Sequence, residues 1–404
     1  MRILFLTHFR RKVGGTETYL SGLLPALLER GHHLGICTQV EGPADRPALE
    51  IPKEIVEWSL TRLDGNRAIA QMAEWRPDVV FCQGIAELDF EAQVLKLAPS
   101  VFYAHNYQCT CISGSKTRAF PTPAPCARTF GPACLLQYYP RRCGGLNPVT
   151  ALRRYGDQLT RLRSLQTYAA IATNSEHLAN EYRRHGLPAQ CLYLFVGGSG
   201  QEHKPVAPID GDPWRILFVG RMDRMKGGRL LLQSLPQIQF EAGREIELVF
   251  IGDGPERTLW QLQAAQVEAA HPGIQVKFNG WMDASELDTQ YAIANLLVVP
   301  SLWPEPFGLV GVEAGLRGVP AVAFAVGGIP EWLQDGENGY LASGNPPTSS
   351  GLVAAVVRAL APENYSRICF RARELAQRWT LERHCHQLER LFEGIIASYQ
   401  VPTN

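Results

Sequence analysis

The feature that most limits the fold of this chain is an alternation of apolar strands with amphipathic helices, which runs through the sequence twice. The first run starts with an apolar segment at residues 2–7 and a helix at 16–30. The second run starts with an apolar segment at 215–220 and a helix at 228–237. Parallel strands need a long connection between them, and that connection is usually a helix packed on the sheet. The sequence therefore predicts an α/β chain with two parallel-sheet domains.

The predicted elements also define domain boundaries within the 404 residues, a length sufficient for two cores. A Pro-bearing stretch at residues 200–213 separates the two runs, and we expect it to be a linker. We expect an N-terminal domain at 1–199, a C-terminal domain at 214–380, and a last helix within 381–404 that packs back on the N-terminal domain. The other strands are expected at residues 33–38, 79–82, 101–105, 169–174, 247–252, 276–279, 294–300 and 321–324, with helices at 176–185, 255–268 and 381–399.

The composition, with 46% hydrophobic and 19% charged residues, is that of an ordinary folded protein. Because the formal net charge is zero, no overall field would attract nucleic acid or an anionic membrane. No apolar run approaches the ~18–20 residues that span a bilayer. Residues 1–8 are too briefly apolar for a signal peptide and fit a first buried strand better. We therefore expect a cytoplasmic protein without a nucleic-acid partner.

Two pairs of charged residues in the second half carry the chemistry. Arg221 and Lys226 follow a predicted strand and precede a helix, where two cations would bind phosphate together with the positive end of the helix dipole. Glu305 stands between two prolines that restrict its backbone, and Glu313 lies in the helical run that follows. Each pair alone is compatible with a solvated loop or a helix-face charge. Together, the cations and the carboxylates, which suit polar hydroxyls, predict a site for a sugar attached to a diphosphate.

These motifs resemble those of the retaining glycosyltransferases of family four. The similarity covers nearly the whole chain and is strongest over residues 214–345. It implies the GT-B fold, in which two Rossmann-like parallel-sheet domains face a central cleft, with the acceptor bound by the N-terminal domain and the donor by the C-terminal domain. The shared features are the loop from Arg221 to Lys226, the Glu-x7-Glu motif of Glu305 and Glu313, and the turns at 14–15, 252–254, 327–331 and 335–339.

The resemblance also implies roles for single residues. Arg221 and Lys226 would hold the donor diphosphate, and Glu305 would bind hydroxyls of the donor sugar. Glu313 would bind the ribose, and His105 would lie near the anomeric carbon. A lone histidine at a strand end is often structural, so the catalytic role of His105 rests on the resemblance. Further donor-binding positions are expected at Gly15, Gly254, Trp281, Met282, Phe307, Gly308 and Leu309, and His8 is a further candidate.

The activity that the resemblance implies is metal-independent transfer of a sugar, with retention, from a UDP- or GDP-sugar to a glycan, lipid-linked or other acceptor. Retention without a protein nucleophile suggests that the leaving group departs and the acceptor attacks on one face, and no cofactor is required. A role in making a surface polysaccharide, glycolipid or other glycoconjugate rests on the family alone. Two alternatives remain: a sugar-nucleotide epimerase of the same fold, and a non-catalytic sugar-nucleotide-binding scaffold.

A Cys-, Pro- and Gly-rich insertion at residues 107–148 departs from the common pattern and holds five of the ten cysteines. Its thiols could form disulfides, which a cytoplasmic setting disfavours, or could be inert in a packed loop. The spacing lacks the paired Cys-x2-Cys typical of many zinc sites. A structural zinc remains the third alternative, with the ligands Cys109, Cys126, Cys134 and Cys143.

The last sequence feature is a local excess of arginine. Residues 126–163 contain seven arginines, no lysine and a single acidic residue, Asp157. With Tyr138 and Tyr139 in the same stretch, this region could dock peripherally on the inner face of an anionic membrane, or bind a phosphate-bearing acceptor. A solvated helix face is the alternative.

Overall fold

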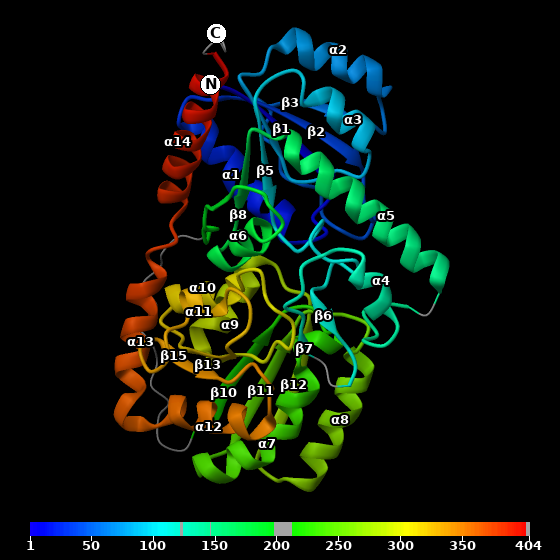
Figure 1. Cartoon of the computed structure of the whole chain (residues 1–404). Coiled ribbons are helices and arrows are strands. Elements are labelled where there is room, and N and C mark those ends of the chain that lie inside the picture. The colour runs from blue at the N-terminus through cyan, green and yellow to red at the C-terminus, as the bar shows by residue number, and fades with distance from the viewer. Residues whose placement is uncertain (122–123, 146, 198–211, 401–404) are drawn as a thin grey trace. The chain divides into compact units, whose positions relative to one another are not determined.

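The structure is a computed structural model that describes residues 1–121, 124–145, 147–197 and 212–400 (Figure 1). Nearly all of the linker expected at 200–213 lies outside the described residues. The chain divides into two compact units. The first contains Met1–Ser115, Arg128–Gly197 and Trp379–Asn404, and the second contains Lys116–Ala127 and Gly198–Arg378.

The first unit is built on a seven-stranded sheet in which all neighbouring strands are parallel. Its strands are β1 (Arg2–Phe9), β2 (His33–Val40), β3 (Val56–Ser59), β4 (Val79–Cys82), β5 (Ser100–Ala104), β8 (Ala170–Thr173) and β9 (Ala189–Cys191), in the order β3-β2-β1-β4-β5-β8-β9. Strand β1, inside the sheet between β2 and β4, is buried over five consecutive residues, because helices cover both faces of a parallel sheet. Those helices include α1 (Gly15–Glu29), α2 (Gly65–Trp75), α3 (Leu88–Val94) and α6 (Glu176–Arg183), with a short 3₁₀ turn at Leu165–Thr167.

The chain's last helix, α14 (Leu381–Gln400), belongs to this first unit. Its inner face contributes the buried side chains Cys385, Leu388 and Phe392 to the same cluster as β1 and α1. The Phe392 ring lies 5.3 Å from the ring of Phe81 on β4. Figure 1 shows α14 alongside α1, so the C-terminal segment completes the core of the N-terminal sheet.

The second unit is built on a six-stranded, entirely parallel sheet. Its strands are β10 (Trp214–Val219), β11 (Ile246–Ile251), β12 (Ile274–Gly280), β13 (Leu296–Val299), β14 (Ala321–Phe324) and β15 (Gly339–Ala342), in the order β12-β11-β10-β13-β14-β15. Its helices are α7 (Gly228–Ala242), α8 (Arg257–Ala270), α9 (Ala284–Ile293), α10 (Leu309–Leu316), α11 (Ile329–Trp332), α12 (Ser349–Leu360) and α13 (Pro362–Ala376), with a 3₁₀ turn at Arg224–Lys226. Each strand expected from the sequence is present in one of the two sheets.

The insertion after β5 is more ordered than expected, since it contains α4 (Ala133–Tyr138) and leads into the long helix α5 (Pro148–Ser164). These two helices pack around a small core that includes Phe130, Tyr138 and Ala151. The insertion also holds two short antiparallel strands, β6 (Thr117–Arg118) and β7 (Ala124–Pro125). These strands belong to the second unit, which differs from the expectation that residues 107–148 all belong to the N-terminal domain.

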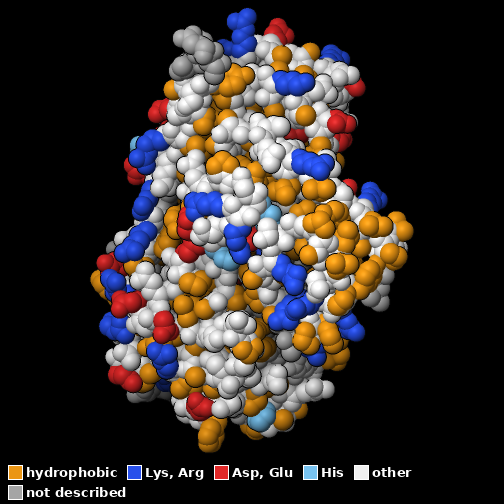
Figure 2. Space-filling model, in the orientation of Figure 1, with side chains coloured by type: hydrophobic (Ala, Val, Ile, Leu, Met, Phe, Trp, Pro, Cys, Tyr) orange, Lys and Arg blue, Asp and Glu red, His pale blue; other side chains and the backbone are white. Residues whose placement is uncertain are grey.

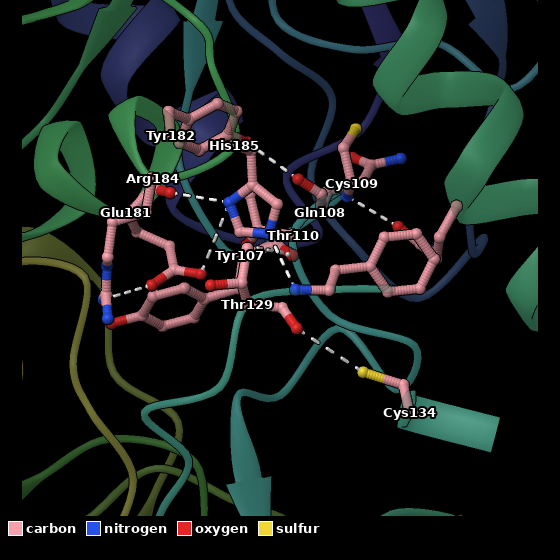
Figure 3. A network of polar contacts seen from close by, with 12 residues as sticks. Tyr107, Gln108, Cys109, Thr110, Thr129, Cys134, Glu181, Tyr182, Arg184 and His185 are labelled. Atoms are coloured by element: carbon pink, nitrogen blue, oxygen red, sulfur yellow. Dashed lines mark hydrogen bonds and ion pairs between the residues drawn. The ribbon is translucent and has the colours of Figure 1, made fainter. Parts of the chain in front are cut away.

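Hydrogen bonds attach the insertion to α6 (Figure 3). The His185 ring accepts from the backbone N–H of Phe130 at 2.8 Å and donates to the carbonyl of Glu181 at 2.7 Å. The Tyr182 hydroxyl donates to the carbonyl of Gln108 at 2.8 Å. Because a backbone N–H can only donate and a carbonyl can only accept, these contacts suit the neutral ring of His185. Among the helices in the described ranges, none is both long and apolar enough to cross a membrane.

Candidate active site

A buried carboxylate, that of Glu305, is the centre of the candidate site in the second unit. Glu305 lies in the loop after β13, at the carboxyl edge of the sheet. The Lys226 ammonium lies 2.6 Å from its Oε1, and the Ser301 hydroxyl donates to the same oxygen at 2.5 Å. Lys226 also lies 5.6 Å from the centre of the Trp303 ring. The fold thus joins a predicted cation to a predicted carboxylate, and each restrains the other.

Two glycines allow the loops around this pair to approach closely. Gly227 has φ 74°, and a Cβ there would lie 1.8 Å from the carbonyl oxygen of Pro300. Gly327 has φ 62°, and a Cβ there would lie 2.1 Å from the carbonyl oxygen of Glu305. A side chain at either position would combine a left-handed backbone with a clash against backbone atoms. The position of Glu305 therefore depends on the turn at Gly327.

Glu313 lies on α10, and its partners are separate from those of Glu305. The Tyr291 hydroxyl donates to Glu313 Oε2 at 3.2 Å, and the Arg317 guanidinium donates to the Glu313 carbonyl at 2.8 Å. Burial raises the pKa of the Glu313 carboxyl, while the hydrogen bond from Tyr291 acts in the opposite direction. Glu313 is consequently fixed in place by α9 and by its own helix.

Arg221 begins the loop after β10, and its side chain is exposed. It forms no ion pair within the part of the chain that the structure describes, in contrast to Lys226. The next residue, Met222, is buried and its N–H donates to the carbonyl of Asp253 at 2.9 Å. A Cβ at Gly254 would lie 2.4 Å from the Met222 carbonyl oxygen, so the loops after β10 and β11 are in contact. The exposed side chain of Arg221 therefore projects from a backbone that is held by the contact between these two loops.

The remaining predicted donor-side residues lie at the same edge of this sheet. Trp281 follows β12 and is 57% exposed, with Met282 beside it in the chain. Phe307 is buried, and its carbonyl accepts from the Trp332 indole N–H at 2.6 Å. Gly308, with φ 88°, and Leu309 form the start of α10, where the first backbone N–H groups have no partner inside the helix.

A neutral pair of side chains lies at the carboxyl edge of the first sheet, where β4 and β5 end. His105 directly follows β5, and its Nε2 lies 2.7 Å from the amide oxygen of Gln83, which follows β4. Burial lowers the pKa of His105 to about 3, so its ring is neutral at pH 7. In β1, His8 lies 2.7 Å from the amide oxygen of Gln39. Gly15 is the first residue of α1, directly after the loop that follows β1.

A buried cluster beside His105 was missed by sequence reasoning. His384 on α14 donates from Nδ1 to the Tyr193 carbonyl at 2.7 Å, so its Nε2 accepts from the Tyr19 hydroxyl at 2.8 Å. The Tyr19 ring stacks on Tyr103 at 5.2 Å and lies edge-on to His105 at 5.4 Å. No local sequence pattern links Tyr19 and His384, which are 365 positions apart. Gln83 and Ser301 could have been found from the sequence, because each lies at the end of a predicted strand, as His105 does.

The four thiols considered as zinc ligands are not brought together. Cys126 belongs to the second unit, whereas Cys109, Cys134 and Cys143 belong to the first. Figure 3 shows Cys109 and Cys134 at separate places in the network around His185. Among the described residues, no group of three or more His, Cys, Asp or Glu side chains is arranged to hold a metal. No disulfide joins any of the cysteines in the part of the chain that the structure describes, and burial raises the pKa of Cys109 to about 12, which favours inert thiols.

The second unit contains the part of the chain that matches a known family. Residues 199–373 match the family model of the glycosyl transferases group 1. This range contains Arg221, Lys226, Glu305 and Glu313, while His105 lies outside it. The match therefore covers the charged residues of the candidate site and does not reach His105.

Two relatives extend this similarity. The chain is 34% identical over 180 residues to D-inositol 3-phosphate glycosyltransferase 1 of Catenulispora acidiphila, which covers 43% of this chain and 42% of that one. It is 32% identical over 221 residues to the lipopolysaccharide 1,2-N-acetylglucosaminetransferase of Salmonella typhimurium, which covers 51% of this chain and 57% of that one. The chain spans about half the length of the curated relatives it matches.

A solved structure matches almost the whole chain. HepE of Anabaena, crystallised with UDP and glucose, superposes with a TM-score of 0.68 and 20% identity, over 97% of this chain and 99% of that one. At this level of identity the similarity establishes the fold. The expected GT-B fold, with two Rossmann-like parallel-sheet domains, is confirmed.

Proposed function

We propose that this protein is a retaining, metal-independent glycosyltransferase of family four, which moves a sugar from a nucleoside-diphosphate donor to an acceptor hydroxyl. The observation that carries the proposal is the contact of 2.6 Å between Lys226 and Glu305 in the region that matches the glycosyl transferases group 1. A cation paired to a buried carboxylate, with the exposed cation Arg221 in the same loop, offers adjacent places for phosphate and for hydroxyls.

On the donor side, the two cations have different tasks. Arg221 is exposed and binds the diphosphate directly, whereas Lys226 is shared between the diphosphate and Glu305. Glu305 accepts from hydroxyls of the donor sugar, and Glu313 accepts from the ribose. Positive charge fixed beside the diphosphate stabilises the negative charge that develops on the leaving nucleotide, which is the service that a metal ion performs in other transferases.

Transfer with retention then needs no protein nucleophile. The bond between the anomeric carbon and the departing phosphate oxygen breaks, and the acceptor oxygen forms its bond on the same face of the sugar. The proton of the acceptor hydroxyl passes to the departing phosphate oxygen. The protein supplies orientation and electrostatic stabilisation, so Glu305 acts as a positioning group that is already engaged by Lys226 and Ser301.

His105 contributes a neutral imidazole. Because burial lowers its pKa to about 3, the ring exchanges hydrogen bonds with sugar hydroxyls instead of adding charge near the anomeric carbon. The acceptor is a glycan or a lipid-linked sugar, and the product belongs to a surface polysaccharide or glycolipid. The name of one relative, a lipopolysaccharide N-acetylglucosaminetransferase, supports this class.

Calorimetric titration with UDP, GDP, ADP and TDP in EDTA, repeated with magnesium, tests the donor site first. We expect one nucleotide to bind equally well in both buffers, and Arg221→Ala to weaken its binding by about two orders of magnitude through loss of a charge-assisted contact. Arg367→Ala removes an exposed arginine on α13 in the same unit and serves as the matched control.

The corresponding nucleotide sugar then distinguishes the alternatives by product. Sugar transfer supports the proposal, an epimerised donor supports the epimerase, and tight binding without any turnover supports a scaffold. Failure of all four nucleotides to bind, or binding only with magnesium, would contradict the donor site. In that case Arg221 and Lys226 would be ordinary solvated loop residues.

A further inference from the structure

A group of large apolar side chains is exposed on the first unit over α4 and α5. Leu136 is 76% exposed, Val149 is 71% exposed and Leu152 is 62% exposed, and Tyr139 is partly exposed beside them in the chain. Figure 2 shows hydrophobic side chains gathered over this part of the molecule, with Lys and Arg side chains around them. Single exposed apolar residues are common, but a group confined to two adjacent helices marks a binding surface.

Helix α5 is apolar on both of its sides, and only one side is used by the fold. Its inner side packs Ala151, Tyr155 and Leu159 against the small core of the insertion. Val149 and Leu152, three residues apart, lie together outside that core. A helix needs one apolar side to pack on its own domain. The second apolar side of α5 is therefore not explained by folding.

The charges around these side chains are almost entirely positive. Arg153 and Arg154 are exposed on the same helix, and Asp157, 4.0 Å from Arg153, is the only acidic residue between positions 126 and 163. Arg161 is not available to a partner, because it donates to the carbonyls of Ile85 and Ala86 in its own unit. Tyr138 is likewise excluded, since it is fully buried.

We propose that Leu136, Tyr139, Val149, Leu152 and Arg153 form a docking surface for the anionic face of a lipid bilayer, and we call this group the α4–α5 surface. The apolar side chains enter the boundary between headgroups and acyl chains, and Arg153, on the same side of α5 as Val149 and Leu152, binds a lipid phosphate. A second copy of this chain is a poorer occupant. A symmetric dimer through this surface would place arginines opposite arginines, with one exposed acid on each copy to balance them.

This inference goes beyond the proposed function and does not depend on sugar transfer. Binding to lipid is measured without any nucleotide, and nucleotide binding is measured without lipid. If the transferase proposal fails, the surface remains testable. If the surface fails, the donor site in the second unit is unaffected.

Flotation of the full chain with vesicles tests the surface. We expect binding to phosphatidylcholine vesicles that contain about 30 mol% phosphatidylglycerol, with little binding to pure phosphatidylcholine, since each arginine adds about fivefold on an anionic surface. Raising the salt from about 0.1 M to about 1 M should release most of the protein by screening. Gel filtration of the same protein should give a monomer.

Two variants separate the apolar and the charged contributions. V149S/L152S should weaken binding at least about tenfold by removing inserted side chains. R153Q should weaken it about fivefold, and only on the anionic vesicles. The control F240S changes an apolar residue that is 85% exposed on α7 of the second unit, and should bind as the unchanged protein does.

Three results would overturn the proposal: absence of flotation with anionic vesicles at low salt, equal flotation of F240S, V149S/L152S and R153Q, or a dimer that V149S/L152S converts to a monomer. The last result would assign the surface to a second copy of the chain. Nucleotide titration of V149S/L152S and R153Q should give unchanged affinity, because their substituted residues lie outside the donor-side unit.

Discussion

The two sheets share one parallel topology, yet their carboxyl edges carry different chemistry. The second sheet presents charges at this edge, namely Arg221, Lys226 and Glu305. Where β4 and β5 end, the first sheet presents His105 and Gln83, which are joined by a hydrogen bond of 2.7 Å and carry no charge at neutral pH. Of the charged residues that follow β1, Arg10 and Lys12 are paired with Glu57 and Glu50. The difference shows that one architecture supports two kinds of recognition. Charged loops suit a diphosphate, and neutral hydrogen-bonding groups suit sugar hydroxyls.

The sharpest test of the charged edge is Lys226→Ala. Removing the ammonium takes away stabilisation of the leaving group and leaves the buried carboxylate of Glu305 without its cation. We expect kcat/KM for sugar transfer to fall about 10³-fold. Lys277→Ala, which removes an exposed lysine paired with Glu247 on the same sheet, should leave the rate unchanged. A loss smaller than about tenfold for Lys226→Ala would show that the charged edge does not carry the reaction.

Gly327→Ala tests whether the charged edge depends on its backbone. A Cβ at this position would meet Glu305 backbone atoms at 2.1 and 2.5 Å, on a left-handed residue. We expect the free energy of unfolding in urea to fall by about 3 kcal/mol, from strain and overpacking together. Gly243→Ala is the matched control, because Gly243 has φ 63° but open space around a Cβ, and it should lose only about 1 kcal/mol. Equal losses in both variants would mean that the loop simply moves aside.

The buried cluster beside His105 predicts a pH effect of a definite sign through His384. Burial lowers the pKa of His384 to about 4, so between pH 4 and 6.5 the unfolded chain binds a proton that the folded chain does not. Stability should therefore fall as the pH falls, by about 2 kcal/mol from pH 6.5 to 5 for this residue. His384→Gln should remove that part of the slope in urea unfolding. His386→Gln, on the exposed side of the same helix, should keep it, and identical slopes in all three proteins would refute the explanation.

The smallest expected effect concerns Trp281, at the carboxyl edge of the second sheet. Trp281 follows β12 and is 57% exposed, so it is available to stack on a nucleotide base. Trp281→Ala should weaken nucleotide binding about tenfold in calorimetry, the usual value of one stacked base. Phe370→Ala removes a similarly exposed ring from α13 and should have no effect. Unchanged affinity in Trp281→Ala would place the base elsewhere.

Much of the fold was predictable because buried parallel strands leave a simple signal. Strands β4 and β14 have the expected bounds, since each is a short apolar run between a break and a polar turn. The edge strands β3, β9 and β15 were missed, because short strands at a sheet edge have a weaker pattern. Helix α5 was also missed, since it begins at Pro148, directly after the irregular insertion, and four arginines are interspersed among its apolar residues.

The candidate site, like the fold, could be predicted from the sequence in part. Strand ends with Arg, Lys, Glu or His are visible in a sequence, so Lys226, Glu305 and His105 could be proposed as site residues. The supporting contacts were not visible: Ser301 donates to Glu305, and Tyr291 donates to Glu313. The thiols of the insertion show the converse error. Their grouping in sequence suggested one site, but the fold places Cys126 in a different unit from Cys109.

The sequence by itself determined the class of fold and the residues that can carry charge to the sheet edges, because periodicity and strand ends are local properties of the chain. Only the tertiary structure decided which of those residues meet. The pairing of Lys226 with Glu305 joins positions 79 apart, and the contact between Tyr19 and His384 joins positions 365 apart. Such contacts depend on how loops and helices pack after the strands have paired, and that packing is a property of the whole fold.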